Sequence, residues 1–284
     1  MSHSTKSPVF SLPVAIGGIG GSGTRVVARM LMECGIFMGG DLNSANDNLW
    51  FSLLFRRDEI FSESPEQLAS LSSVFVKAMC SVPLSGTEIT LVRQLASTPR
   101  PELPTRWLRQ RADSLQASTR SSPNKGPWGW KEPNTHIVIH QLLHTIPGLR
   151  YIHVIRNGLD MAYSANQNQL QLWGRHLLGE ECPTGPRCAL RFWHRANRRV
   201  IELLADTPDR FLLLDFDRLC LEPTEEIGRL IAFLDVRDHT ADIQHLKSLL
   251  RVPSSIGRFK AHSAADFSDE DIRYVRALGF DTTY

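Results

Sequence analysis

The sequence lacks any uninterrupted apolar run near the ~20 residues of a membrane-spanning helix, and it carries little net charge. A formal charge of +2 over 284 residues is too small to favour nucleic acid or an anionic membrane surface as a partner. No charged stretch followed by an apolar one opens the chain, so no secretory signal is predicted and we expect a cytoplasmic protein. A pocket for a small anion is compatible with this charge, because it needs only a few side chains.

Cysteine is also scarce, and the residues of this type are Cys34, Cys80, Cys182, Cys188 and Cys220. An odd number without a Cys-x-x-Cys motif matches neither a disulfide framework nor a zinc site. We therefore predict reduced thiols and no bound metal. Cys182 and Cys188 flank residues 183–187, and their pairing as a clip on this loop is left open.

The chain length fits one large domain, and 42% hydrophobic with 22% charged residues is typical of a globular protein. Apolar runs predict strands at residues 14–19, 126–131, 150–156 and 210–215. Helical spacing predicts helices at residues 24–34, 135–145, 190–204 and 223–234. Strands that alternate with helices indicate a mostly parallel sheet covered on both faces, in a single α/β domain over residues 13–284.

Residues 62–126 differ from this pattern. They hold weak helical segments at 65–79 and 103–115, separated by Ser, Pro and Thr clusters. We predict an inserted helical lid that packs over one end of the sheet and contributes to acceptor binding. Residues 170–188 are predicted to form a second, Gly/Pro-rich loop.

A glycine loop at residues 17–25 joins the first predicted strand to the first predicted helix. Glycines let several backbone N–H groups turn toward one anion, and the helix that follows adds a partial positive charge. Hydroxyl groups and a guanidinium add further donors. The loop therefore predicts an anion site built from Gly20, Gly21, Ser22, Gly23, Thr24 and Arg25.

Two nucleotide-binding patterns fit this loop. Gly18, Gly20 and Gly23 match the dinucleotide fingerprint, but no convincing strand precedes Asp41 as its acidic partner. The segment from Gly18 to Thr24 resembles an NTP-binding loop with threonine in place of the lysine. An NTP-dependent kinase with a degenerate phosphate loop and a Rossmann-type nicotinamide or flavin enzyme are therefore alternatives.

A second anion site is predicted at the end of the third strand. Arg156 ends that apolar run, and Ser164 follows eight residues later. If a helix begins near Leu159, Ser164 lies about two turns into it, beside the strand end. Arginine and serine together suit a phosphate dianion. Two phosphate sites predict a nucleotide that has phosphates at both ends of its ribose.

These motifs resemble those of the sulfotransferase superfamily, in particular its bacterial and carbohydrate-type members. Residues 20–25 are similar to the 5'-phosphosulfate loop, and residues 154–164 are similar to the 3'-phosphate motif. Residues 130–133, 213–234 and 255–260 are similar to a strand end, a late strand and helix, and a C-terminal loop that closes on the nucleotide. The resemblance implies a P-loop-like three-layer fold.

The same resemblance implies an activity: transfer of a sulfuryl group from 3'-phosphoadenosine 5'-phosphosulfate to a hydroxyl or amine. The acceptor would be a carbohydrate or a small metabolite, and the reaction needs no metal. A catalytically silent nucleotide-binding protein of the same fold is a further alternative. Nothing in the sequence predicts the oligomeric state.

The resemblance also assigns roles to residues. Gly257, Arg258 and Lys260 would contact the nucleotide. Lys131 is our candidate for the cation at the leaving oxygen, because it ends a predicted strand near the same edge of the sheet. Asp47 would be the general base, because it lies shortly before an aromatic pair. The alternatives for the base are Asp41, Glu132 and His136. Many members have lysine where this chain has Gly21, and Arg25 or Lys131 would replace that charge.

Overall fold

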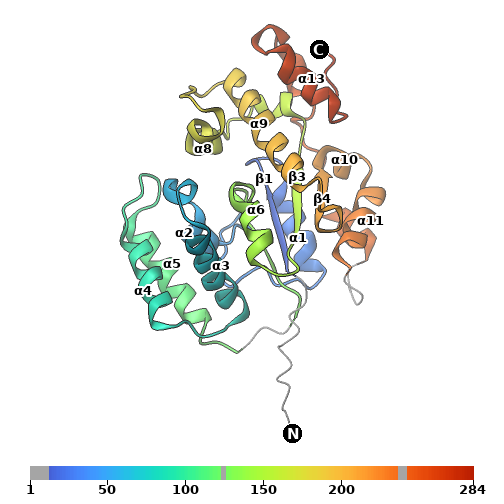
Figure 1. Ribbon diagram of the computed structural model, residues 1–284. Coiled ribbons are helices and arrows are strands. Elements are labelled where there is room, and N and C mark those ends of the chain that lie inside the picture. Colours follow the sequence, from blue (N-terminus) through green and yellow to red (C-terminus); the bar gives the residue numbers. More distant parts are fainter. Residues whose placement is uncertain (1–12, 123–125, 236–241) are drawn as a thin grey trace.

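A computed structural model describes residues 13–122, 126–235 and 242–284. Its centre is a four-stranded sheet of order β2-β1-β3-β4, in which every pair of neighbours is parallel. The strands are β1 (Val14–Gly18), β2 (Gly129–Lys131), β3 (Arg150–Ile155) and β4 (Phe211–Asp215). The predicted α/β fold, with helices on both sides of a parallel sheet, is confirmed (Figure 1).

Each face of the sheet has its own hydrophobic core. Val14 and Ile16 of β1 belong to a core with apolar side chains of α1 (Thr24–Glu33) and α11 (Pro223–Leu234). Ala15 belongs to the core on the opposite face, with side chains of α6 (Thr135–Thr145) and α9 (Pro186–Leu204). All five residues of β1 are buried. This burial explains why β1 is a continuous apolar run rather than an alternating one.

The described part of the segment at residues 62–126, where weak helical segments are predicted, is helical. It follows α2 (Leu49–Phe55) and η1 (Asp58–Phe61), and it contains α3 (Pro65–Cys80), α4 (Gly86–Ser97) and α5 (Thr105–Ser118). Helix α4 was not predicted, although Ser85 and Glu88 form a capping box at its start. These helices stand together on one side of the sheet (Figure 1). Their role as a lid stays a prediction.

The predicted loop at residues 170–188 is largely wrong, because α8 (Asn168–Leu178) occupies its first half. Leu170 and Trp173 are buried at helical spacing, and this burial stabilises the helix. The remaining elements are α7 (Gly158–Ala162), η2 (Pro208–Arg210), α10 (Phe216–Leu221), α12 (Ile243–Ser248), η3 (Arg258–Ala261), η4 (Ala264–Asp266) and α13 (Asp269–Ala277). No helix in the described ranges has the length and apolar character needed to cross a membrane.

The loop between α8 and α9 carries a disulfide. Cys182 and Cys188 are bonded, so the prediction of reduced thiols is wrong for this pair. The other cysteines are free and buried. Disulfides are rare in cytosolic proteins, so this pair does not favour the predicted cytoplasmic location.

Gly129 lets β2 approach β1, and its replacement tests the register of the sheet. A Cβ at this position would lie 2.2 Å from the carbonyl oxygen of Val14. We expect Gly129→Ala to lower the free energy of unfolding by more than about 2 kcal/mol in urea denaturation, because two backbones must separate. Gly228→Ala is the control: Gly228 is exposed on α11, a Cβ there would have nothing within 4 Å, and the variant should gain up to about 1 kcal/mol. Equal midpoints for wild type and Gly129→Ala would contradict the pairing.

Candidate active site

The glycine loop is pressed between β3 and the start of α10. Gly18, Gly21 and Gly23 have φ of 148°, 96° and 96°, a region that side chains disfavour. A Cβ on Gly18 would lie 2.4 Å from the Val154 carbonyl oxygen, and one on Gly23 would lie 2.2 Å from the Phe216 ring. The loop therefore has this shape only with glycine at these positions.

The loop keeps hydrogen-bond donors without protein partners. Ser22 is 1% exposed, and its Oγ has no partner among the described residues. Gly23 is the N-cap of α1 and supplies no side-chain cap for the helix amides. Arg25 is exposed and forms no ion pair with the described part of the chain. A buried hydroxyl and an uncapped helix start suit an anion.

The predicted second phosphate site faces this loop. A Cβ on Gly21 would lie 3.8 Å from Ser164 Oγ, and one on Gly20 would lie 3.1 Å from Asn166 Nδ2. The predicted helical position of Ser164 is wrong, because α7 ends at Ala162. Ser164 lies in the turn that follows, where its Oγ accepts a hydrogen bond from the Asn166 amide at 3.2 Å. The turn brings the hydroxyl toward the glycine loop.

Arg156 is buried and already has partners. Its Nε donates to Asp217 Oδ1 at 3.0 Å, and its Nη2 donates to Ser255 Oγ at 2.7 Å. The other oxygen of Asp217 accepts the backbone amide of Asn157 at 3.0 Å. Asp217 was not predicted, although it lies two residues beyond the carboxyl end of β4, where parallel sheets place functional side chains. An anion at Arg156 would bond to the guanidinium N–H groups that these bonds leave free.

The C-terminal loop, residues 255–260, lies along α7. Asp160 accepts the backbone amides of Gly257 at 2.8 Å and Phe259 at 3.1 Å, and burial raises the pKa of this carboxyl. Arg258 Nη1 donates to the carbonyl oxygen of Tyr163 at 2.9 Å, next to Ser164 in the chain. Gly257 and Arg258 are thus held close to the predicted phosphate site.

Lys260, unlike Gly257 and Arg258, is paired with the C-terminal segment. Its Nζ pairs with Asp281 at 2.7 Å, and the hydrogen bond from this ammonium lowers the pKa of Asp281 to about 2. The structure therefore turns Lys260 toward the C-terminal segment. No contact joins it to the glycine loop among the described residues.

The two predicted catalytic residues meet at the end of β2. Lys131 is 3% exposed, and its Nζ forms an ion pair with Asp47 Oδ1. The same ammonium donates to the carbonyl oxygen of Ala45 at 3.1 Å, and Asp47 Oδ2 accepts from Asn43 Nδ2 at 2.7 Å. Asp41, the first alternative for the base, is paired with Arg111 at 3.1 Å.

Glu132 lies next to Lys131 but points into the protein. Its Oε2 accepts the backbone amide of Asn134 at 2.6 Å, and its Oε1 accepts the side-chain amide of the same residue at 2.9 Å. Burial, aided by the nearby charge of Asp47, raises the pKa of Glu132 to about 7. Asn134 Oδ1 in turn accepts Trp173 Nε1 at 2.7 Å, which links this carboxyl to α8.

His136, the last alternative for the base, is fully buried beneath the glycine loop. Its Nε2 lies 3.4 Å from Gln169 Oε1, and its Nδ1 has no partner among the described residues. Burial, together with nearby His153 and Arg199, holds the pKa of His136 well below its usual value. The ring is therefore neutral and shielded from solvent.

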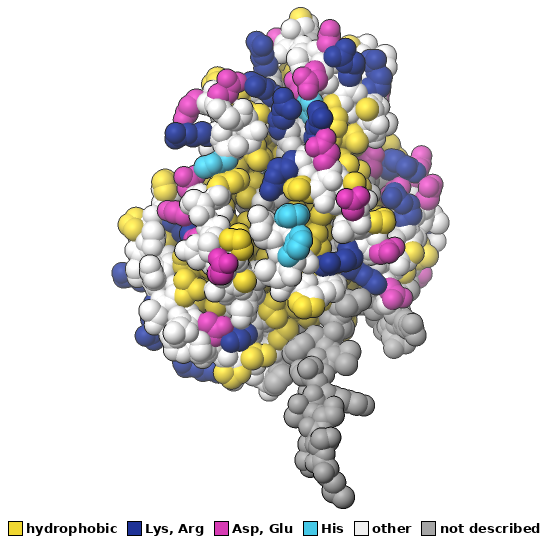
Figure 2. All heavy atoms as spheres, in the orientation of Figure 1, with side chains coloured by type: hydrophobic (Ala, Val, Ile, Leu, Met, Phe, Trp, Pro, Cys, Tyr) yellow, Lys and Arg dark blue, Asp and Glu magenta, His cyan; other side chains and the backbone are white. Residues whose placement is uncertain are grey.

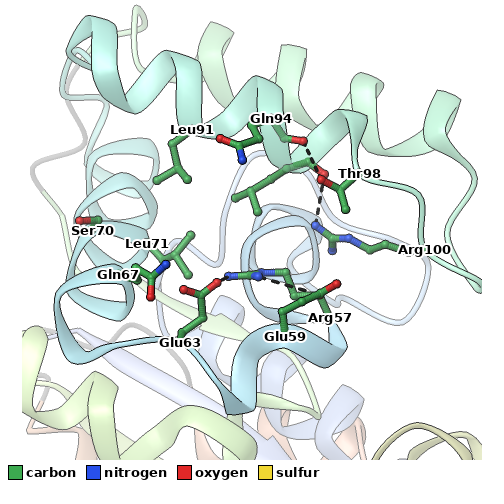
Figure 3. Close-up of a pocket in the computed structure, with 11 residues that line it drawn as sticks. Arg57, Glu59, Glu63, Gln67, Ser70, Leu71, Leu91, Gln94, Thr98 and Arg100 are labelled. Carbon is green, nitrogen blue, oxygen red and sulfur yellow. Dashed lines mark hydrogen bonds and ion pairs between the residues drawn. The ribbon is translucent and has the colours of Figure 1, made fainter.

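Two hollows lie outside this strand edge and share a wall of Arg57, Glu59 and Arg100. The larger, of about 370 Å³, lies between α3 and α4 (Figure 3). Arg57 pairs there with Glu63, and Arg100 donates to backbone carbonyls at the end of α2. Arg100 Nε has no partner among the described residues, but the carboxylates of Glu59 and Glu63 also line this hollow and disfavour a phosphate there.

The smaller hollow, of about 270 Å³, lies between η1, residues 99–103 and α8. Trp173 lines it and also bonds to Asn134, so one wall of this hollow is joined to the end of β2. No cluster of three or more His, Cys, Asp or Glu side chains suited to a metal ion occurs in residues 13–122, 126–235 and 242–284.

Comparison with known proteins gives one family. The model of the sulfotransferase family matches residues 13–240. A sulfotransferase domain from the curacin biosynthetic pathway is 15% identical, with a TM-score of 0.54 over 98% of this chain and 100% of that one. A sulfotransferase domain from the olefin synthase of Synechococcus PCC 7002 is 17% identical, with a TM-score of 0.51 over 98% and 99%. At these identities the two structures show a shared fold. No curated protein matches the chain.

The raised pKa of Glu132 predicts a pH dependence of stability. Between about pH 4.5 and 7 the folded protein holds a proton that the unfolded chain releases, so stability falls as the pH rises through this window. We expect the free energy of unfolding of wild type to fall by about 3 kcal/mol relative to Glu132→Gln between pH 4.5 and 8, measured in urea. Parallel pH profiles for the two proteins would contradict the burial of an ionisable group here.

Proposed function

The chain belongs to the sulfotransferase family, and we propose that it transfers a sulfuryl group from 3'-phosphoadenosine 5'-phosphosulfate to a hydroxyl or amine of a small acceptor. The observation that carries the proposal is the approach of the two phosphate sites. A Cβ on Gly21 would lie only 3.8 Å from Ser164 Oγ, so one ligand can contact both. A nucleotide with a phosphate at each end of its ribose would contact both sites.

The residues present suit that donor, which supplies the sulfuryl group and a phosphate leaving group. Ser22, Thr24 and the amides at the start of α1 would hold the 5' end, because the hydroxyl of Ser22 and the helix start lack protein partners. Ser164 and the remaining guanidinium N–H groups of Arg156 would hold the 3'-phosphate. Gly20, Gly21, Gly23 and Arg25 would complete the loop, and Gly257 and Arg258 would cover the nucleotide.

In this proposal Lys131 and Asp47 are the two catalytic residues. Lys131 stabilises negative charge as the phosphate leaves, and Asp47 accepts the proton of the acceptor. The side chain of Asp47 is 20% exposed, whereas Glu132 and His136 are buried. Only a carboxyl that an acceptor can reach serves as a base, and this favours Asp47. The contact between the two side chains supports assigning both roles to one part of the site.

We place the acceptor in the smaller hollow, between η1, residues 99–103 and α8. Trp173 lines it and connects through Asn134 to Glu132, next to Lys131 in the chain. A hollow of about 270 Å³ takes a small metabolite or a sugar, and an indole wall suits either. Basic and acidic side chains are interspersed on the face that Figure 2 shows, which fits a small acceptor better than nucleic acid.

The donor proposal predicts a specific stabilisation. Adenosine 3',5'-bisphosphate at 100 times its Kd should add about 2.7 kcal/mol to the free energy of unfolding and raise Tm by several degrees. ATP with magnesium, and NAD, should leave Tm unchanged in parallel thermal scans. Stabilisation by ATP with magnesium alone would favour the kinase, and stabilisation by NAD alone would favour a dinucleotide enzyme.

The base proposal predicts a separation of binding from turnover. Asp47→Asn should lower turnover by at least about 100-fold, because a positioned base contributes this much, and should leave bisphosphate affinity within about twofold. Turnover is measured as release of the bisphosphate from the donor with a panel of hydroxylated acceptors. Asp113→Asn, at an exposed position of α5, is the matched control and should keep full activity. Full turnover in Asp47→Asn would remove Asp47 from the mechanism.

A further inference from the structure

Gln169 of α8 reaches the glycine loop from a distant part of the chain. Its Oε1 accepts the backbone amide of Gly20 at 3.4 Å, and its Nε2 donates to the carbonyl oxygen of Gly18 at 3.3 Å. The side chain is 5% exposed, and His136 Nε2 lies 3.4 Å from the same Oε1. One amide group therefore bonds to two peptides of the loop.

Backbone hydrogen bonds hold both ends of this part of the loop. The amide of Gly18 donates to the carbonyl of Pro133 at 3.1 Å, and the amide of Ser22 donates to the carbonyl of Ile19 at 3.0 Å. Gly18 is also held by its pairing with Val154 of β3, whereas Gly20 lies beyond the strand and, as a glycine, needs outside contacts to hold one orientation. Gln169 supplies them. Long hydrogen bonds in a ligand-free site commonly shorten when the ligand binds.

The same helix is anchored a second time, one turn further on. Trp173 Nε1 donates to Asn134 Oδ1 at 2.7 Å, and Asn134 bonds to Glu132, the neighbour of Lys131. Residues 171–173 of α8 also line the smaller hollow. Helix α8 thus contacts the loop after β1, the turn after β2 and the hollow at once.

We propose that Gln169 is a positioning residue: it fixes the Gly18 and Gly20 peptides so that the following loop amides face the donor, and it ties this loop to the helix that borders the acceptor hollow. The role rests on the proposed function, because it concerns the donor site. Gln169 touches neither reacting group. Its loss weakens donor binding through the loop while the loop sequence stays intact.

The test uses the affinity of the full chain for adenosine 3',5'-bisphosphate, measured by titration calorimetry. Gln169→Leu has nearly the same size but no hydrogen-bonding groups, and its Kd should rise about tenfold. Gln244→Leu, on exposed α12, makes the same chemical change away from the site and should bind as wild type does.

Gln169→Glu separates positioning from simple packing. A protonated carboxyl has one donor and one acceptor, like the amide, whereas the ionised form cannot donate to the Gly18 carbonyl. The ratio of its Kd to that of wild type should therefore fall as the pH is lowered from 8 to 5.5, and Gln169→Leu should show no such recovery.

Glu132, which is joined to α8 through Asn134 and Trp173, titrates in this pH range with a pKa of about 7, but it does so in wild type as well and therefore cancels in the ratio of the two Kd values. The charged and titratable groups nearest to position 169 do not change in this range. They are His136 of α6, His153 and Tyr151 of β3, and Arg199 of α9, which donates to the His136 carbonyl at 3.0 Å. Burial lowers the pKa of His153 to about 4 and that of His136 well below its usual value, and it raises that of Tyr151. Recovery of affinity at low pH therefore reports the introduced carboxyl.

The outcomes distinguish this role from the proposed function. No binding of the bisphosphate by wild type would remove the donor proposal, and the role of Gln169 with it. Tight binding by wild type and equally tight binding by both Gln169 variants would overturn the positioning role alone. If Gln169→Leu does not fold, the pH-dependent ratio for Gln169→Glu decides: a flat ratio contradicts the role and a falling ratio supports it.

Discussion

Strand β1 lies between β2 and β3, and its parallel pairing with both decides where the candidate catalytic groups are. The register aligns Ile16 with Lys131 and Gly18 with Val154. Three strands therefore end at the same edge of the sheet, and the glycine loop, Lys131 and Arg156 leave it side by side. Residues separated by more than one hundred positions in the sequence become neighbours because parallel strands share one direction.

At this edge of the sheet, side chains are excluded from the glycine loop and the buried charges are paired. At Gly18 and Gly23 the glycine loop has no room for a side chain, because the Val154 carbonyl and the Phe216 ring lie against these positions. The backbone of the loop therefore borders the site. The charges beside it are buried, and each has a partner: Lys131 pairs with Asp47, and Arg156 pairs with Asp217. A buried charge without such a partner costs several kcal/mol, so these pairs hold the site together before any ligand arrives. Helix α8 also contacts this edge, through Gln169 at the glycine loop and Trp173 at the turn after β2.

Much of this arrangement is visible in the sequence. The predicted helices at 135–145 and 223–234 match α6 and α11 residue for residue, because periodic apolar positions and clear stops mark them. The prediction failed where local composition misled, as for α4 and α8, whose Ser, Pro and Gly neighbours suggested loops. It also missed Asp217 and Gln169, and the contact of Ser255 with Arg156. These residues lie 61, 99 and 149 positions from their partners, and no local pattern encodes such contacts.

The claim that two phosphate sites serve one nucleotide is tested most directly by a crystal structure of the protein with adenosine 3',5'-bisphosphate. We expect the 5'-phosphate against the amides and hydroxyls of residues 22–24, and the 3'-phosphate against Ser164 and Arg156. A nucleotide bound elsewhere, or bound through only one of its phosphates, would contradict the account.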